Sequence, residues 1–215
     1  NGAVDGVFCP MKERGNLRDE LLIAYETDDP VENVLFQKER LVRVNAAKTA
    51  FRGVVFERCT FEDCDFSGCD MRKAIFRKCL LVGCDFSGGY WNGCTLDSCN
   101  ASGCDMGDSR IVDTNIQGSQ FQYAVCWRTR WEDCRISDTA FTEACLNEMI
   151  LKRTEFYNVD MTKAELMGTM LKGIDLSGCT IDGIAISDSK KELAGAQVNV
   201  GQAIALARLL GVKVV

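Results

Sequence analysis

Histidine is absent from the 215-residue chain, and its absence removes whole classes of chemistry. Ser-His-Asp triads, Cys-His pairs and HExxH zinc motifs all require a histidine. Proline occurs only at Pro10 and Pro30, and no apolar run reaches the roughly 18 to 20 residues that span a bilayer. The first residues lack the basic and apolar segments of a secretory signal. We therefore expect a cytoplasmic protein without a membrane partner.

Nucleotide-binding and redox motifs are missing as well. The sequence has no GxxxxGK[ST] loop, no GxGxxG after a strand pattern and no CxxC pair. The formal net charge of −6 argues against nucleic acid as a direct ligand. These absences predict a protein that is not an enzyme and that has no catalytic residues, no cofactor and no metal site.

Cysteine, in contrast, is abundant, and its spacing is regular. Ten of the 13 cysteines lie at multiples of five residues from one another: Cys59, Cys64, Cys69, Cys79, Cys84, Cys94, Cys99, Cys104, Cys134 and Cys179. Cysteine therefore fills one recurring position of a repeat, where a free thiol acts as a small buried apolar group. A metal ladder or disulfides between stacked cysteines are the alternatives.

A period of five also governs the apolar residues. Every fifth position from Phe51 to Ile186 is apolar, over 28 consecutive units. Glycine is frequent two positions later, and Asp or Asn is frequent one position earlier, and both favour turns. A period of five fits neither a helix nor a single strand. It predicts a solenoid in which short extended segments alternate with turns and stacked coils bury a shared core.

The units at residues 64–68 and 84–88, Cys-Asp-Phe-Ser-Gly in both, resemble the pentapeptide repeat. The resemblance implies an all-β fold, a right-handed quadrilateral β-helix with four pentads in each 20-residue coil. The repeat covers residues 49–188, and residues 31–48 keep its phase as a degenerate first coil, so we assign residues 31–188 to the β-helix. Seven coils spaced by about 4.8 Å make a rod of roughly 34 Å.

The two ends do not follow the repeat. Residues 1–30 are expected to form an N-terminal capping segment, with a short helix from Asn16 to Thr27. Residues 189–215 are expected to form a C-terminal cap with a helix from Asn199 to Gly211 and a short strand over residues 212–215. The apolar surface of this cap exceeds what one cap needs and predicts a homodimer. The candidate interface residues are Ile204, Leu206, Ala207, Leu209, Leu210, Val212 and Val214.

Charge is unevenly distributed along the predicted rod. Residues 49–81 hold six basic and five acidic residues, whereas residues 82–188 hold eight basic and 16 acidic residues. The acidic part is either an ordinary solvated surface or a mimic of duplex DNA. The residues chosen as candidate contacts to a partner protein are Asp97, Asp108, Asp113, Glu132, Asp133, Asp138, Glu143 and Glu148. Duplex DNA of the rod's length carries about 20 phosphates, so any mimicry by this part is partial.

The C-terminal pattern, with Gln202, Leu206 and Leu210, resembles the tail of Gram-positive Qnr-like and MfpA-like pentapeptide repeat proteins. That resemblance implies a dimer that binds DNA gyrase and topoisomerase IV in place of DNA and protects them from quinolones. The uninterrupted phase from residue 51 to 186 lacks the two loops that proteobacterial Qnr proteins insert into the repeat. The alternative functions are a structural scaffold for another partner and immunity to a toxin that poisons gyrase.

Overall fold

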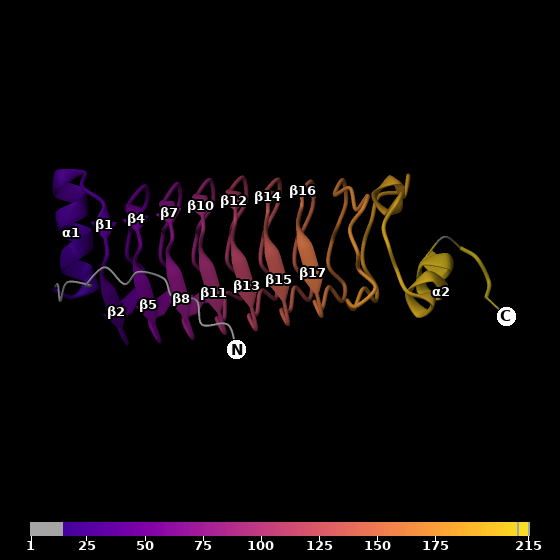
Figure 1. Ribbon diagram of the computed structural model, residues 1–215, viewed down its shortest axis with the longest axis horizontal. Helices are drawn as coiled ribbons and strands as arrows, with labels where there is room; N and C mark the ends of the chain where they lie inside the picture. Colours follow the sequence, from indigo (N-terminus) through magenta and orange to yellow (C-terminus); the bar gives the residue numbers. More distant parts are fainter. Residues whose placement is uncertain (1–14, 210, 215) are drawn as a thin grey trace, which may run out of the picture.

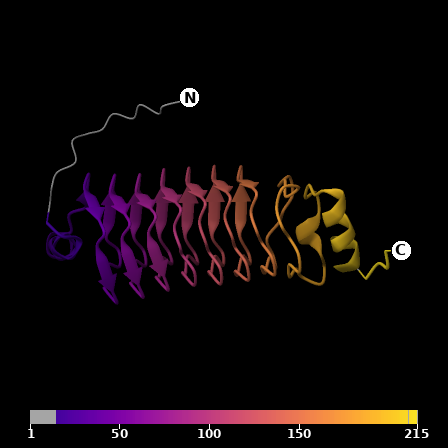
Figure 2. The same ribbon diagram turned by 90° about the horizontal axis from the view of Figure 1, so that it is seen from below.

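The computed structural model describes residues 15–209 and 211–214, which form one long β-solenoid with a helix at each end (Figures 1 and 2). All strand pairs are parallel, and the strands gather into three sheets along the rod. The first sheet contains β1 (Val31–Glu32), β4 (Ala50–Arg52), β7 (Asp70–Arg72), β10 (Tyr90–Asn92), β12 (Arg110–Val112), β14 (Arg130–Glu132) and β16 (Ile150–Lys152). The second contains β2 (Leu35–Gln37), β5 (Val55–Glu57), β8 (Ile75–Arg77), β11 (Thr95–Asp97), β13 (Asn115–Gln117), β15 (Arg135–Ser137) and β17 (Glu155–Tyr157). The third contains β3 (Arg40–Val42), β6 (Thr60–Glu62) and β9 (Leu80–Val82).

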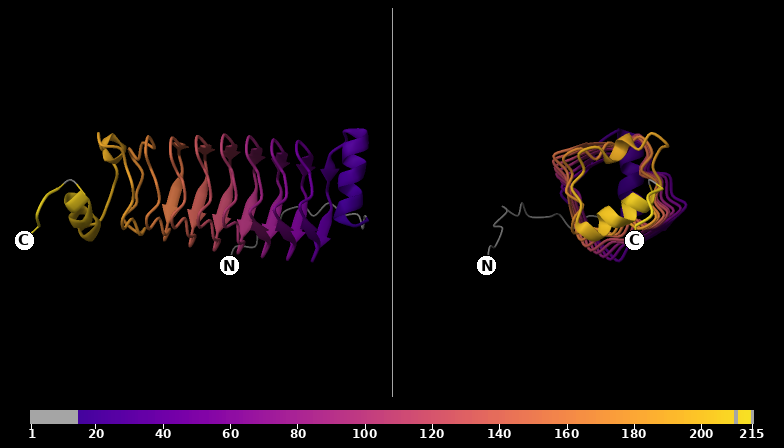
Figure 3. Two further views of the ribbon diagram at one scale, coloured as in Figure 1. Left: turned by 180° about the vertical axis from the view of Figure 1, so that it is seen from behind. Right: turned by 90° about the vertical axis from the view of Figure 1, so that its right-hand side faces the viewer.

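Residues 20 positions apart stack on one another in neighbouring coils. Phe36 pairs with Phe56 and Phe56 with Phe76, and the same register continues through the second sheet. Seen along its axis, the rod has a four-sided outline (Figure 3, right). The fold class predicted from the five-residue period is therefore confirmed. Val31 pairs with Phe51 in the same register, so the first coil is regular in spite of its degenerate sequence.

Each corner of the coil lies two residues after a central apolar residue. Most residues at this position have positive φ, such as Gly118 at 58° and Asp138 at 50°. Glycine adopts this backbone conformation without strain, whereas other residues meet a steric penalty. The corner position explains the frequent glycine in the sequence and places any other side chain at an outer edge of the rod.

The core is a stack of the central residues and of the small residues that lie two positions before them. Phe36, Phe56 and Phe76 form one aromatic column, with ring centroids 5.7 and 4.8 Å apart. Trp91 and Trp131 are almost fully buried, and within the described residues their indole N–H groups have no hydrogen-bond partner. Leaving such a donor unpaired costs about 1 to 3 kcal/mol, which the burial of these large rings offsets.

All ten in-phase cysteines are buried, as the repeat predicts, and they are free thiols. Many of them donate to a carbonyl of the preceding coil, as Cys79 Sγ does to Phe56 O at 3.3 Å and Cys99 Sγ to Phe76 O at 3.4 Å. Burial raises the pKa of Cys94 and of Cys134 to about 11. Among the described residues, no group of three Cys, Asp or Glu side chains could hold a metal ion.

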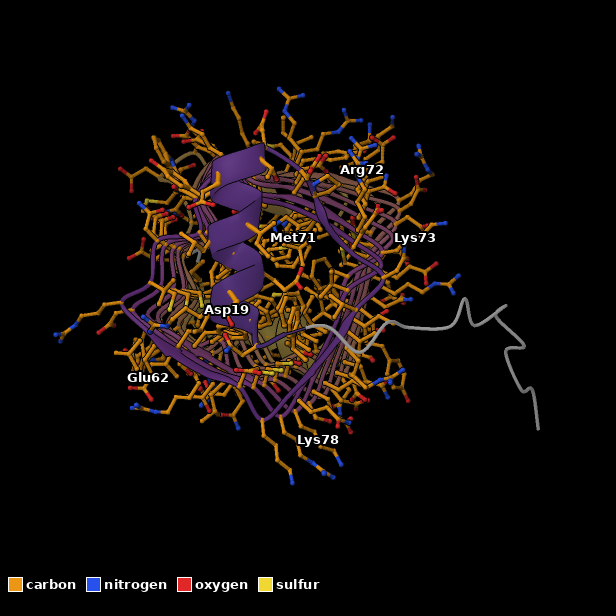
Figure 4. All side chains as sticks on the ribbon, turned by 90° about the vertical axis from the view of Figure 1, so that its left-hand side faces the viewer. Asp19, Glu62, Met71, Arg72, Lys73 and Lys78 are labelled. Atoms are coloured by element: carbon orange, nitrogen blue, oxygen red, sulfur yellow. The ribbon has the colours of Figure 1, made fainter. Side chains whose placement is uncertain are left out.

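The N-terminal end is closed by helix α1 (Leu17–Thr27), which lies across the first coil (Figure 4). Asn16 caps this helix, because its side chain accepts a hydrogen bond from the backbone N–H of Asp19 at 3.0 Å. Leu17 and Leu21 of α1 are buried and belong to the core.

The C-terminal end is closed by a short 3₁₀ helix η1 (Lys191–Leu193), the segment to Gln197, and helix α2 (Val200–Leu209). Asn199 and Gln202 form a reciprocal capping box at the start of α2, with bonds of 2.8 and 2.9 Å. The strand predicted for residues 212–215 is wrong for residues 212–214, which form no strand. An isolated extended segment gains no ladder hydrogen bonds, and no described strand pairs with it. Among the described residues, neither helix has the length and apolar character that crossing a bilayer requires.

Candidate protein-docking surface

The eight acidic residues selected from the sequence all point outward. Six of them, Asp108, Asp113, Asp133, Asp138, Glu143 and Glu148, occupy corners with φ between 48° and 56°. Asp97 and Glu132 end strands β11 and β14, and both side chains are partly exposed. The repeat therefore places every one of these carboxylates where a partner protein could reach it.

The structure does not bring these eight residues onto one surface. Asp113 and Asp133 lie on the same corner of consecutive coils, next to Glu132. Asp138, Glu143 and Glu148 then follow at successive corners of the four-sided coil, so they lie on different edges of the rod. A single flat partner surface cannot contact all of them at once, because one flat surface meets only one side of the rod and its two edges.

Several of these carboxylates are already paired with a cation of the next coil. Glu132 lies 2.7 Å from both Lys152 and Arg153, and Asp133 lies 2.6 Å from Arg153. Hydrogen bonds from Lys152 and then Arg153 lower the pKa of Glu132, and the bond from Arg153 lowers the pKa of Asp133. These acidic corners are therefore largely neutralised by the protein itself.

Two further pairs repeat this pattern at other corners. Arg128 lies 2.8 Å from Asp108, and Lys163 lies 3.8 Å from Glu143. Within the described part of the chain, no ion pair is formed by Asp97, Asp113, Asp138 or Glu148. Asp97 accepts a hydrogen bond from the Ser98 hydroxyl, and Asp138 accepts one from the Asn158 amide. These four keep their charge available to a partner, although they lie on different edges.

A row of aspartates that sequence reasoning assigned only to turn formation makes a more coherent surface. Asp65, Asp85 and Asp105 are bridged in parallel from coil to coil, so their side chains follow one another along one side of the rod. Each carboxylate accepts the backbone N–H two residues later, at 2.9, 2.8 and 2.7 Å. One oxygen of each carboxylate supports the turn, while the residue stays partly exposed.

The surroundings of this row are small and carry no cation of their own. We define the aspartate face as residues 63–68, 83–88 and 103–108, which contain five aspartates and no Lys or Arg. An additional Cβ at Gly88 or Gly103 would meet no atom within 4 Å, so this side of the rod is open. Among the described residues, cations lie at the two ends of the face: Arg43 is 3.7 Å from Asp63, the Lys48 side chain packs beside Gly68, and Arg128 is 2.8 Å from Asp108. The signal that could have revealed this face is the recurrence of Asp at intervals of 20 with Ser or Gly beside it.

The C-terminal dimer candidates are partly exposed on the outer side of the cap. Ile204 and Leu209 of α2 each expose 39% of their surface, and Val212 and Val214 are exposed as well. Leu206 instead packs against the core, and Ala207 is half-buried. Leu210 lies outside the described residues.

Two family models match the chain. Both describe pentapeptide repeats, in nine and eight copies, and they match residues 43–89 and 79–118. Comparison with curated protein sequences gives no significant match.

The fold is similar to solved structures of pentapeptide repeat proteins. One is QnrB1, a plasmid-mediated fluoroquinolone resistance protein, with 20% identity and a TM-score of 0.52 over 84% of this chain and 100% of that chain. Another is HetL of the cyanobacterium Nostoc sp. strain PCC 7120, with 12% identity and a TM-score of 0.39 over 87% of this chain and 95% of that chain. The family models thus identify pentapeptide repeats over residues 43–118, about a third of the chain, and the unbroken five-residue period and four-sided parallel coil show the fold of pentapeptide repeat proteins.

Proposed function

We propose that this chain is a non-catalytic cytoplasmic protein that binds a type II topoisomerase, DNA gyrase or topoisomerase IV, as a mimic of DNA. We propose further that it protects the enzyme from quinolones. The observation that carries the proposal is the aspartate face, a regular row of carboxylates on an open side of the rod. The likeness in fold to a fluoroquinolone resistance protein supports the choice of partner.

The charge density of the aspartate face supports DNA mimicry at a local scale. Asp63 and Asp108 are paired with arginines, and the three carboxylates without an ion pair, Asp65, Asp85 and Asp105, span three coils, or about 10 Å at an inter-strand spacing of about 4.8 Å. Duplex DNA of that length carries about six phosphates, at one charge per 1.7 Å. The row therefore carries about half the charge of DNA over the same length, so the mimicry is local and partial.

The paired corners around Glu132 and Asp133 contribute less in this proposal. A partner cation that binds there has to compete with Lys152 and Arg153, which already lie within 2.7 Å of the carboxylates. At a solvent-exposed site such an exchange of one ion pair for another gains little free energy. Recognition therefore concentrates on the carboxylates of the aspartate face that have no cation of their own.

A gyrase supercoiling assay, with and without ciprofloxacin, tests the function, and a direct binding measurement with the gyrase subunits tests the surface. The informative variant is Asp85→Asn with Asp105→Asn. Asparagine occupies the same position at Asn45 and Asn100 and accepts the same backbone hydrogen bond there, so the turns are retained. We expect the double variant to bind gyrase roughly tenfold more weakly than the wild type, a difference of about 1.4 kcal/mol. We also expect the wild type to lose affinity as salt is added.

The matched control is Asp160→Asn with Asp175→Asn. These two aspartates accept the same kind of backbone bond but lie on other sides of the rod, and their substitution removes the same number of charges. Equal weakening by both double variants would reject the aspartate face. If the wild type never binds a type II topoisomerase, the DNA-mimic proposal fails and the scaffold interpretation replaces it.

We also propose that the chain assembles as a two-fold homodimer through its C-terminal cap. Ile204, Leu209, Val212 and Val214 are exposed apolar residues of the cap at the C-terminal end of the rod. A two-fold contact closes on itself and buries the same surface on both copies. Residues 212–214 have no strand partner among the residues that the structure describes, and a second copy would supply one.

A further inference from the structure

One corner of the N-terminal coils carries a row of cations. Lys38, Arg58 and Lys78 occupy the same corner of three consecutive coils, because Gln37, Glu57 and Arg77 before them are paired in register. All three side chains are exposed, and their backbones have φ of 52° to 56°. In Figure 4, Lys78 projects outward from one corner of the outline, and Lys73 projects from the next. We call Lys38, Arg58 and Lys78 the basic ridge.

The basic ridge differs from the cations at the corners of the C-terminal coils. Arg128, Arg153 and Lys163 occupy equivalent corner positions, and each is paired with an acidic residue of the preceding coil, at 2.8, 2.6 and 3.8 Å. Within the described residues the basic ridge forms no ion pair, and its residues instead follow one another along the rod at the inter-strand backbone spacing of about 4.8 Å. Like charges directly opposite one another in a sheet are destabilising, so the fold itself gains nothing from this arrangement.

The residues beside the ridge carry both signs of charge. Arg77, beside Lys78, is exposed and forms no ion pair within the described residues, and it stacks in register between Glu57 and Asp97. The Glu57 carboxylate accepts a hydrogen bond from the amide of Gln37 at 2.7 Å. Residues 31–81 contain ten basic and seven acidic residues, in contrast to the acidic remainder of the rod. The overall net charge of −6 therefore conceals a local surface of the opposite sign.

We propose that the basic ridge binds the phosphodiester backbone of a nucleic-acid strand that runs along the rod. The ridge presents one cation per coil along a narrow edge. It therefore matches a linear polymer with regularly spaced charges better than it matches a partner with a flat surface. Phosphate contacts by Lys and Arg need no base-specific geometry and gain free energy from the release of counterions. This proposal is independent of the partner assigned to the aspartate face.

The test is fluorescence anisotropy of a labelled 20-nucleotide single strand, titrated with the full chain at about 50 mM salt. The variant Lys38→Gly, Arg58→Gly and Lys78→Gly removes the ridge without straining the backbone, since Gly118 occupies the same corner two coils later with φ of 58°. The wild type should bind with an affinity that falls steeply with salt. The variant should bind on the order of 100-fold more weakly at this salt, with a correspondingly smaller salt dependence.

The matched control is Arg128→Gly, Arg153→Gly and Lys163→Gly, which removes the same number of cations, each from a different corner of the acidic coils. This control should retain the binding of the wild type. Loss of binding in the control as large as in the ridge variant, unchanged binding in the ridge variant, or no binding by the wild type would each overturn the proposal. Displacement of the strand by polyglutamate at an equal concentration of charge would also overturn it, because the ridge would then recognise any acidic chain.

Discussion

The two ends of the rod each cover an open edge of the β-helix, but they do so with different kinds of contact. At the N-terminal end, α1 covers the first coil with the apolar side chains of Leu17 and Leu21. At the C-terminal end, the cap supplies hydrogen bonds to the open edge of the last coils. Gln202 Nε2 donates to Leu176 O and Cys179 O at 2.8 and 2.6 Å. The N-terminal end is therefore closed mainly by apolar burial, whereas the C-terminal end combines apolar contacts from Leu193, Val198 and Leu206 with these hydrogen bonds.

Glu192 is a buried acidic residue that accepts several hydrogen bonds at the C-terminal end. The residue is buried, its carboxylate accepts the N–H of Gly168 at 2.9 Å, and its backbone oxygen accepts the N–H of Leu171 at 2.9 Å. Burial alone would raise the pKa of Glu192, but the hydrogen bonds from Gly168 and Ser187 together lower it. The difference between the ends teaches that an open edge of backbone groups can be satisfied by one buried carboxylate and one buried amide.

The largest effect on stability should come from the apolar cap. Leu17→Ala removes a fully buried side chain and should lower the free energy of unfolding by about 2 to 5 kcal/mol, because it leaves a cavity between α1 and the first coil. Urea unfolding followed by circular dichroism measures this change. Leu22→Ala on the exposed side of α1 is the control and should change stability by less than about 0.5 kcal/mol. Equal effects of both variants would show that α1 does not seal the core.

The polar cap should give a smaller effect that depends on pH. Glu192→Gln weakens charge-assisted hydrogen bonds and should lower the free energy of unfolding by about 1.5 kcal/mol at pH 7. The pKa of Glu192 is lower in the folded protein, so its contribution is complete above the usual glutamate pKa of about 4.3 and is lost as the pH falls through the folded value. The difference between wild type and variant should therefore shrink between pH 7 and pH 3. A difference that stays constant over this range would contradict a role for the charge.

Substitutions in the predicted dimer interface should have the smallest effect on stability. They should also distinguish the two ends most sharply, because only the C-terminal end is expected to form a dimer. Ile204→Asp with Leu209→Asp changes partly exposed residues of α2 and should leave the fold intact while converting a dimer to a monomer. The equivalent change at the other end, Leu22→Asp with Ile23→Asp on α1, should leave the dimer unchanged. Light scattering at micromolar concentration measures both. A monomeric wild type, or a dimer lost only through the α1 variant, would contradict the C-terminal interface.

The repeat made most of the solenoid predictable from the sequence. The core position of Phe56, the buried position of Cys79 and the corner position of Gly118 each follow from the period of five. The helix at residues 200–209 followed from its cap and its composition. The C-terminal strand could not be judged in the same way, because a strand exists only where another strand supplies hydrogen bonds.

The candidate surface was predicted less well, and the reason lies in the neighbours of each side chain. Asp133 looked like a free surface charge in the sequence, but Arg153 of the next coil lies 2.6 Å away. Asp85 looked like a turn residue, and it is one, but it also stands in a row with Asp65 and Asp105. A pattern of residue types predicts which side chains point outward, whereas it does not predict which of them pair.

The sequence by itself determined the coil, because its rules act within five residues. An apolar side chain turns inward, a small residue fits beside it, and a residue that tolerates positive φ forms the corner. The tertiary structure alone decided the electrostatic surface. Charges 20 residues apart come within a few ångströms only after the coils have stacked. The length and direction of each side chain then decide whether two such charges form an ion pair. Asp108 is paired in this way by Arg128, whereas Asp85 keeps an unpaired charge and Arg58 lies beside a second cation.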